Sequence, residues 1–489
     1  MSFAERLPAE VWATVFDLCM PEEDEEFSDA TTPVKEAYRL AKLYLLRLSK
    51  VCSYWHAIVM GTPALWRYII ADTTLWGKSG YSESTLLRLV SVSLQRSQNF
   101  PLRIQVALED DTALGQTSGA KLMALLCPHS TRWRSIYLWH NYPSFELLVT
   151  IKNRIPLLET VGLSLQNDQW HERVGMDVFG DAPRLAEFTM TGRADTPLPT
   201  FPVRQLHVFG FTNLFTDELA EACTLIGQLD GFTGDQCWIR LDVDDPEIDL
   251  DHFPSVSSNT SALQLTLTLP SNRNAATLWE RPVLGAILGA LTLPSLQYLG
   301  LINTVKQRSL LWDHAHFLQF SQRSQFRSTL VEFELNRVLI TDVELIECLQ
   351  HMPALTQLVV ADCAPENHAL VTDLLVTRLT DTGTPAVTPL VPALNFFSIS
   401  TLFAFSDGAF IDFMNQRAGR AGAAPFEIKI YWLPVRARPQ LSQQLLDLGS
   451  ALEKGGVLLF TASKDPEYDS VWSFAAAQSS WGPNGSAIA

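Results

Sequence analysis

The feature that most constrains the fold is a short apolar pattern that recurs from residue 133 to residue 459. Each copy has an apolar residue, two residues of any kind, a second apolar residue, one further residue and a third apolar residue. The clear copies are Trp133/Ile136/Leu138, Leu158/Val161/Leu163, Leu185/Phe188/Met190, Val203/Leu206/Val208, Leu296/Leu299/Leu301, Leu330/Phe333/Leu335, Leu355/Leu358/Val360 and Leu394/Phe397/Ile399. Weaker copies surround Ile239/Leu241, Leu263/Leu265, Ile428/Ile430 and Val457/Leu459. Because the last two apolar positions alternate, they share one face of a strand, and each copy predicts a short strand.

The spacing of these copies predicts how the strands are connected. Successive copies begin 18 to 39 residues apart, with a mean of about 29, which is typical of long leucine-rich repeats. Helical stretches lie between them, such as 342–349 with Thr341 as N-cap, and 441–452. A strand followed by a helix cannot bury its apolar face alone, so such units stack. The predicted fold class is therefore α/β: residues 80–464 form an irregular leucine-rich-repeat solenoid with a parallel sheet.

Two details bear on the start and the regularity of this solenoid. A helix over Glu83–Gln95 and a lead-in strand with Leu102, Ile104 and Val106 are expected to open the sheet. The repeat consensus next expects Asn or Cys three residues after the last apolar position, and among the twelve copies only Asn141 and Cys363 comply. A generic α/β domain with several short strands is therefore the alternative.

In a solenoid the apolar triplets face the core, and the strand positions between them face the open surface. These positions hold aromatic residues and arginine next to charged residues, a composition that suits a protein-binding face. The alternative is that many of them pack against loops. The predicted face comprises Tyr137, Trp139, His207, Phe209, Trp238, Arg240, Asp242, Tyr298, Glu332, Glu334, Phe396, Lys429 and Tyr431.

The first seventy residues carry a different pattern, with helical spacing. It runs Leu7-Pro8-x-Glu10-Val11-x-x-x-Val15-Phe16-x-x-Cys19, resumes as Leu48-x-x-Val51-Cys52-x-x-Trp55-x-x-Ile58, and ends Pro63-x-Leu65-Trp66-x-x-Ile69. Pro8 suits a helix start, Glu10 suits the positive end of a helix dipole, and the apolar residues recur every three or four positions. A segment this short is marginal without a partner.

This ordered set of residues resembles the F-box, a helical motif that binds a Skp-type adaptor and thereby joins a cullin-based ubiquitin ligase. The combination with degenerate leucine-rich repeats resembles the large fungal F-box families. The resemblance implies an adaptor-binding surface made of Leu7, Pro8, Val11, Phe16, Val51, Cys52, Trp55, Leu65 and Trp66. The alternative is a small helical cap that closes the apolar end of the domain behind it.

The resemblance also sets the expected boundaries. The F-box spans residues 1–72 and departs from the family pattern at an acidic insertion, residues 21–39, whose role is open. Residues 465–489 are rich in Ala, Ser, Gly and Pro and are expected to form a flexible C-terminal tail.

Charge and cysteine usage restrict the kind of partner and the compartment. The net charge of −17 and pI near 5.0 argue against general binding to nucleic acid or to an anionic membrane. The seven cysteines occur singly, without zinc-ligand or redox spacing. The most apolar run, 283–293, is far shorter than the ~20 residues that span a bilayer, and no signal peptide is evident. We expect a cytoplasmic or nuclear protein.

Motifs for catalysis or metal binding are weak. Gly77-Lys78-Ser79 lacks the glycine that a phosphate-binding loop needs, and the acidic residues between Asp242 and Asp251 lack an EF-hand turn glycine. His314 and His316 have no third ligand at an obvious spacing. We therefore predict no catalytic residue, metal site or cofactor.

The sequence thus favours a substrate receptor of an SCF-type ubiquitin ligase, with a Skp-type adaptor, and through it a cullin, on the F-box and a target protein on the repeat surface. One alternative is a binding scaffold that engages the adaptor but delivers no target. The other is an enzyme whose residues are scattered through the C-terminal domain.

Overall fold

The computed structural model describes residues 7–20, 45–72, 82–107, 113–139, 144–164, 177–192, 200–216, 220–243, 253–268, 283–305, 308–363, 368–380, 390–418, 426–432, 447–448 and 458–464. The acidic insertion, Gly77–Ser79, Asn141, most of 441–452 and the tail 465–489 lie outside these ranges. The chain forms two compact units: residues 1–192 with 196–202, and residues 193–195 with 203–489. Each unit is described by itself below.

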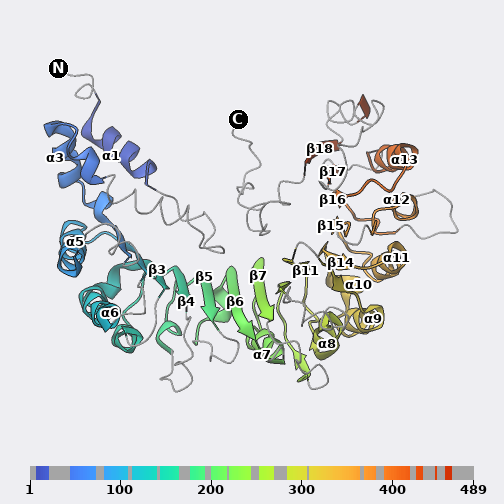
Figure 1. The fold of residues 1–489 in the computed structure, drawn as a ribbon, viewed down its shortest axis with the longest axis horizontal. Helices are drawn as coiled ribbons and strands as arrows, with labels where there is room; N and C mark the ends of the chain where they lie inside the picture. The colour runs from blue at the N-terminus through green and yellow to red at the C-terminus, as the bar shows by residue number, and fades with distance from the viewer. Residues whose placement is uncertain are drawn as a thin grey trace. The chain divides into compact units, whose positions relative to one another are not determined.

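The first unit begins with helices and continues with strands (Figure 1). Its elements are α1 (Ala9–Leu18), α3 (Ser53–Gly61), η2 (Pro63–Trp66), β1 (Tyr68–Asp72), α5 (Glu83–Arg96), β2 (Leu102–Ala107), α6 (Ala113–Leu126), η3 (Cys127–Arg132), β3 (Trp133–Trp139), η4 (Ser144–Ile151), β4 (Thr160–Ser164), η6 (Asp177–Phe179) and β5 (Glu187–Gly192). The strands pair in parallel in the order β1-β2-β3-β4-β5. Helices α5 and α6 lie on one side of them.

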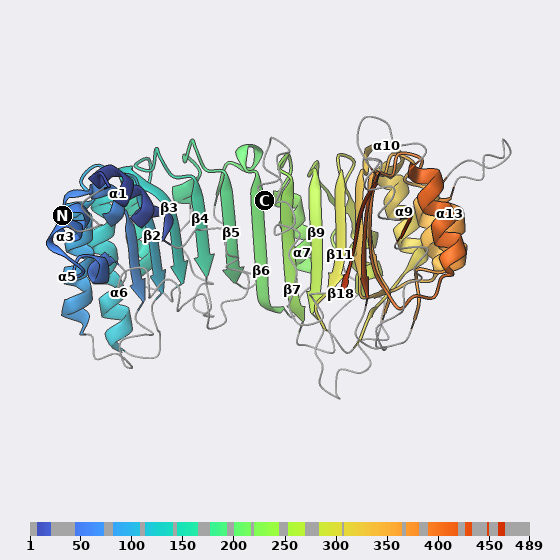
Figure 2. The same ribbon diagram turned by 90° about the horizontal axis from the view of Figure 1, so that it is seen from above.

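The second unit continues the same strand-then-helix alternation (Figure 2). Its main elements are η7 (Val203–Gln205), β6 (Val208–Thr216), α7 (Ala220–Gln228), β7 (Gln236–Val243), β9 (Ala262–Thr268), α8 (Val283–Ala290), β11 (Tyr298–Asn303), α9 (His314–Arg323), α10 (Phe326–Thr329), β13 (Glu332–Asn336), α11 (Asp342–Gln350), β15 (Gln357–Ala361), α12 (Asp373–Leu379), β16 (Phe396–Thr401), α13 (Asp407–Ala418), β17 (Phe426–Trp432) and β18 (Leu458–Lys464). These strands pair in parallel in chain order. Two short parallel pairs, β8 (Val256–Ser257) with β10 (Leu291–Thr292) and β12 (Leu310–Leu311) with β14 (Val338–Leu339), lie apart from the main sheet.

The predicted fold class is confirmed: a small helical N-terminal region precedes a parallel sheet with helices. The sheet starts one strand earlier than the lead-in strand predicted at Leu102, because Ile69 in β1 pairs in register with Ile104 in β2. The end of the predicted F-box segment is therefore the first strand of the sheet. No helix among the described residues is long and apolar enough to span a membrane.

One predicted copy of the repeat is out of register. The triplet assigned to Val203, Leu206 and Val208 is wrong, because the strand begins only at Val208 after the turn η7. The buried residues are Leu206, Phe209 and Phe211, which follow the same spacing three residues later. Two overlapping matches exist here, and the structure uses the one that buries two phenylalanines, which remove more apolar area from water.

The helix N-termini of the last repeats are linked in series. Thr341 caps α11, and Glu344 completes a capping box, as the predicted N-cap requires. In the next repeats the cap hydroxyl binds the preceding helix: Thr372 donates to Asp342 over 2.6 Å, and Ser406 donates to Asp373 over 2.9 Å. An acidic residue just inside each helix thus fixes the start of the next helix.

The consensus position after β15 also holds neighbouring repeats together. Cys363, one of the two residues that match the consensus, is buried and donates from its thiol to the carbonyl of Val338 over 3.2 Å. Its neighbour Asp362 is 2% exposed. The Asp362 carboxylate accepts hydrogen bonds from the backbone N–H groups of Leu370, Val371 and Leu402 and from the Thr401 hydroxyl. Burial raises the pKa of Asp362, and these bonds oppose that rise.

Candidate functional site: two docking surfaces

The core of the F-box region is aromatic. Trp12 and Phe16 of α1 pack on Trp55 of α3, with ring centroids 4.8 and 5.0 Å from the Trp55 ring. Phe16 is 1% exposed and lies in one buried cluster with Leu65 and Trp66 of η2. The predicted adaptor residues Phe16, Leu65 and Trp66 therefore form the interior that positions the helices.

The inner side of this region is attached to the first repeat. The Arg96 guanidinium of α5 donates to the carbonyl of Met60 in α3 over 3.4 Å and lies 5.1 Å from the Trp66 ring. Arg67 forms a 3.0 Å ion pair with Asp17 at the end of α1. The helical region therefore does cover the start of the repeats, which is what the cap alternative requires of this side.

The outer side of α1 exposes a stripe of apolar side chains. Leu7, Val11, Val15 and Leu18 are 37, 43, 37 and 72% exposed, and Val51 is 60% exposed. The spacing of four and three residues places Val11, Val15 and Leu18 on one face of α1, and Leu7 directly precedes the N-cap residue Pro8. We name these five residues the α1 patch. A helical cap alone needs no such exposed stripe.

The remaining predicted adaptor residues shape the patch. Pro8 is the N-cap of α1, with its carbonyl accepting from the N–H groups of Val11 and Trp12. The Tyr54 hydroxyl donates to the Leu7 carbonyl over 2.8 Å and ties this segment to α3. Cys52 caps α3 through its sulfur.

Two patch residues, Val15 and Leu18, were not among the predicted adaptor residues. Both are apolar and follow Val11 by four and seven residues, so helical spacing from Val11 is the signal that finds them.

The second surface is the sheet face opposite the helices in the second unit. In register, one row across the sheet contains Gly210, Trp238, Gln264, Gly300, Glu334, Val359, Ser398 and Lys429. A neighbouring row contains Tyr298, Glu332, Gln357, Phe396 and Glu427. We name these residues, with Arg240, Asp242 and Tyr431, the open face. The predicted face residues Trp238, Arg240, Tyr298, Glu334, Phe396 and Tyr431 all lie on it.

Aromatic side chains on the strand faces lie over glycines. A Cβ atom on Gly210 would meet the Trp238 indole at 2.2 Å, and one on Gly300 would meet the Tyr298 hydroxyl at 2.5 Å. In the first unit a Cβ on Gly162 would likewise meet the Tyr137 ring at 2.3 Å. The missing side chain lets each ring lie flat beside its neighbour. These aromatics are consequently half-buried or buried.

A buried polar group occupies the middle of the open face. The Tyr298 hydroxyl lies 2.9 Å from Glu334 Oε2 and 3.2 Å from Gln264 Oε1. Burial raises the pKa of Glu334 to about 7, the Tyr298 contact opposes the rise, and Glu332 adds to it. The Tyr298 hydroxyl can donate to either acceptor, and a protonated Glu334 satisfies both contacts by donating to Tyr298 while Tyr298 donates to Gln264. Burial is what favours a neutral Glu334.

The charged groups at either side of the open face are paired. Arg240 contacts Asp242 over 3.1 Å. Lys429 contacts Glu427 over 3.0 Å, and its ammonium lies 5.1 Å from the centroid of the Phe396 ring.

Three other predicted face residues have different outcomes. The assignment of Phe209 is wrong, because Phe209 is fully buried in the core, for the register reason given above. His207 is exposed but precedes β6. The side chain of Trp139 lies outside the described residues.

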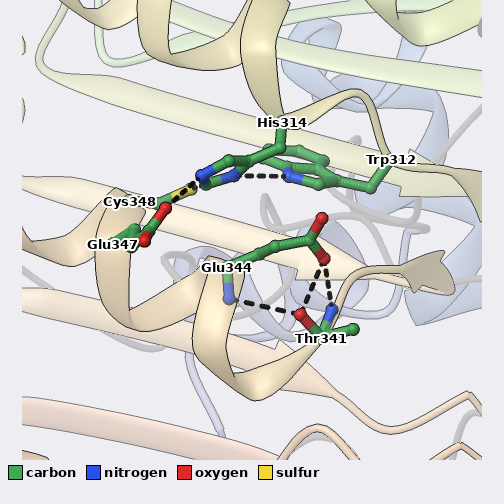
Figure 3. Close-up of polar contacts among 6 residues, drawn as sticks. All are labelled: Trp312, His314, Thr341, Glu344, Glu347 and Cys348. Atoms are coloured by element: carbon green, nitrogen blue, oxygen red, sulfur yellow. Dashed lines mark hydrogen bonds and ion pairs between the residues drawn. The ribbon is translucent and has the colours of Figure 1, made fainter.

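The helix layer brings together a histidine, a cysteine and a glutamate (Figure 3). His314 Nε2 lies 2.6 Å from Glu347, and His314 Nδ1 lies 3.9 Å from the Cys348 sulfur and 3.4 Å from the Trp312 indole nitrogen. The connectivity is that of nucleophile, base and orienting carboxylate. However, Cys348 is fully buried, and desolvation with nearby Glu344 and Glu347 raises the pKa of its thiol. The arrangement opposes the thiolate that such chemistry needs.

The histidines of α9 are held by carboxylates. His316 contacts Asp313 over 2.7 Å, as His314 contacts Glu347. Within the described ranges no three His, Cys, Asp or Glu side chains are grouped closely enough to hold a metal ion.

Comparison with known proteins identifies one region. Residues 4–76 match the F-box-like family model, so the chain carries an F-box-like domain there. No curated protein matches the chain. The yeast Rad7 and Elc1 complex contains a chain that is 13% identical, with 82% of this chain and 97% of that chain covered and a TM-score of 0.30. A TM-score this low does not establish a common fold.

Proposed function

We propose that this chain is the substrate-receptor subunit of an SCF-type ubiquitin ligase. The α1 patch docks a Skp-type adaptor, which joins the chain to a cullin, and the open face binds a target protein. The exposed stripe on α1 carries this proposal, because it lies within the F-box-like domain and is not used by the fold. Ubiquitin transfer follows from proximity, since holding two reactants together raises their effective concentration.

The apolar area of the α1 patch determines how much binding free energy other contacts with the adaptor must supply. The five side chains are already partly covered, with 37 to 72% of each exposed, so complete burial stabilises the complex by roughly 1 kcal/mol each. Their sum lies near the low end of the roughly 4–15 kcal/mol that association costs. Docking through the α1 patch therefore requires additional contacts from the adaptor.

The test is a binding assay with the full chain and a purified Skp-type adaptor. The double variant V11D/V15D places two charges in the patch and should abolish binding, because a buried unpaired carboxylate costs several kcal/mol. The matched control is V343D, which introduces the same group at a valine of α11 that is 53% exposed. Equal binding by all three proteins would exclude the α1 patch as the docking site.

Adding cullin separates the receptor from a scaffold. A receptor should recruit cullin only when the adaptor is bound, and V11D/V15D should lose both partners together. Recovery of the adaptor with no cullin would instead favour a scaffold that delivers no target.

A further inference from the structure

Lysine is scarce and unevenly distributed in this chain. The sequence contains 10 lysines and 26 arginines. Six of the lysines lie before residue 153, at positions 35, 42, 50, 78, 121 and 152. The 276 residues from 153 to 428 contain one lysine, Lys306. A long part of the repeat region is therefore almost without amine side chains.

Among the described residues of the second unit, the exposed side chains with a permanent positive charge are arginines. Arg323 stabilises the C-terminal end of α8, because its guanidinium donates to the carbonyls of Leu288, Gly289 and Leu291. Arg327 and Arg378 are exposed on α10 and α12, and within the described part of the chain neither guanidinium makes a hydrogen bond or an ion pair. Lysine has nearly the same helix propensity as arginine. Contacts therefore do not explain the choice of arginine at these two positions.

The only described lysine side chain of the second unit is already engaged. Lys429 contacts Glu427 over 3.0 Å, lies over the Phe396 ring, and has a side chain that is 27% exposed. Its ammonium is thus stabilised in the charged form by a carboxylate and an aromatic face.

The difference between lysine and arginine matters for ubiquitin transfer. A neutral lysine amine attacks the carbonyl carbon of the thioester that links the ubiquitin C-terminus to a cysteine of the conjugating enzyme. An isopeptide C–N bond forms, the C–S bond breaks, and the proton lost by nitrogen passes to the leaving cysteine thiolate. Arginine remains protonated at all physiological pH values and does not act as the nucleophile.

We propose that the chain protects the lysine-poor part of its repeat region, residues 153–428, from ubiquitin by using arginine there in place of lysine, so that self-modification is confined to lysines before residue 153, chiefly Lys121. This inference rests on the proposed function, because it requires the chain to be held beside a ubiquitin-charged enzyme.

The described N-terminal lysines differ as acceptors. Lys121 lies on α6, and its side chain is 55% exposed with a 3.0 Å contact to Glu83. The Lys152 amine donates to Asp177, and this hydrogen bond raises the Lys152 pKa, which lowers its share of neutral amine. Lys50 precedes Val51, so an adaptor on the α1 patch covers its surroundings. Lys121 is therefore the preferred acceptor of the three.

The experiment is reconstituted ubiquitination of the full chain with adaptor, cullin–RING module and charged conjugating enzyme, with modified lysines mapped by mass spectrometry. The unmodified sequence should carry ubiquitin mainly on Lys121. The double variant R327K/R378K adds two exposed amines without a change of charge. It should carry about twice as much ubiquitin as the unmodified sequence, with ubiquitin remnants mapped to both new lysines. The control R327Q/R378Q changes the charge without adding amines and should gain none.

Two further measurements make the result decisive. Acetylation by an amine-reactive ester should label both amines introduced by R327K/R378K, which verifies that they are accessible. If they acetylate and receive no ubiquitin, or if the unmodified sequence is modified mainly at Lys306, Lys429, Lys454 or Lys464, the inference is overturned. If the chain neither binds adaptor nor receives ubiquitin on any lysine, the proposed function fails and the inference with it.

Discussion

Helices α1 and α11 are of similar length, but they differ in how far the rest of the chain covers their apolar residues. The apolar face of α11 is largely buried, whereas α1 has an exposed apolar stripe. Helix α11 begins with a full capping box and buries Leu345, Ile346, Cys348 and Leu349. Helix α1 has no side-chain cap, buries Phe16, and leaves Val11, Val15 and Leu18 exposed. Both helices have apolar faces, so apolar character alone does not distinguish a core helix from a docking helix.

The difference lies in what covers the apolar face. In the repeat region each helix packs on its own strand and on the next helix, so most of its apolar side chains are buried within the unit, and those left exposed, such as Val343 of α11, are isolated. In the F-box-like domain the inner side chains are buried by α3 and η2, and the outer ones are left to a partner. The comparison therefore predicts that equal substitutions on the two sides of α1 have opposite consequences for stability and binding.

The largest effect is expected on the inner side of α1. Phe16→Ala removes a fully buried ring that packs on Trp12 and Trp55, and should cost about 3–5 kcal/mol of stability. Amide hydrogen exchange should show lost protection in α1 and α3, while the strands of the second unit keep theirs. Unchanged protection in α1 would contradict the assignment of Phe16 to the core.

The second prediction concerns the open face, where polar groups are satisfied internally. Glu334 is protonated in the folded chain between its ordinary pKa of 4.5 and its raised pKa of about 7. In this window the native state binds more protons than the unfolded state, so stability falls as pH rises. A shift of this size corresponds to about 3 kcal/mol, lost progressively from pH 4.5 to just above pH 7.

The variant E334Q checks this directly, because a neutral amide can donate to Tyr298 at every pH. Urea unfolding at pH 5 and pH 8 should show a smaller loss of stability in E334Q than in the unmodified sequence. Asp362 and Glu332 also have raised pKa values and remain in both proteins, so the difference between the two slopes reports Glu334. Parallel slopes would show that Glu334 is ionised in the native state at both pH values.

The third prediction concerns the cap of α11. Thr341→Ala removes the side-chain acceptor for the Glu344 N–H and should destabilise the chain by about 1 kcal/mol. Thr341→Ser keeps the hydroxyl and serves as the matched control, with little expected change. A loss as large as that of Phe16→Ala would show that the cap also supports the neighbouring repeats through Asp342.

Features of this fold that depend on residues close together in the chain can be predicted from the sequence, and features that depend on contacts between strands cannot. The capped helix at 342–350 and the strand pattern depend on residues close together in the chain, so local signals suffice. The register of β6 was missed because two overlapping triplets fit the pattern, and burial of Phe209 decides between them. The rings of Trp238 and Tyr298 lie over glycines. For Trp238 the glycine is Gly210 in the neighbouring strand, so the sequence of the Trp238 strand alone does not predict the contact.

The same limit explains the adaptor residues. The motif selected Phe16, Leu65 and Trp66 together with Leu7 and Val11, but the first three are buried and the last two exposed. A sequence motif does not specify which of its apolar residues are buried against neighbouring helices and which are exposed. Helical spacing from Val11 adds Val15 and Leu18, which are the residues that the comparison with α11 identifies as unused by the fold.

The smallest effect on stability is therefore expected at Leu18. This side chain is 72% exposed, so Leu18→Ala removes little buried area and should change the free energy of unfolding by less than about 0.5 kcal/mol. Because part of the Leu18 side chain is already covered, its complete burial in a complex is worth roughly 1–2 kcal/mol, which corresponds to about a fivefold to thirtyfold loss of adaptor affinity. Unfolding and titration calorimetry with the adaptor measure the two quantities on one sample. Loss of stability without loss of affinity would reverse the roles assigned to the two sides of α1, because Leu18 would then belong to the fold and the stripe would no longer be free for a partner.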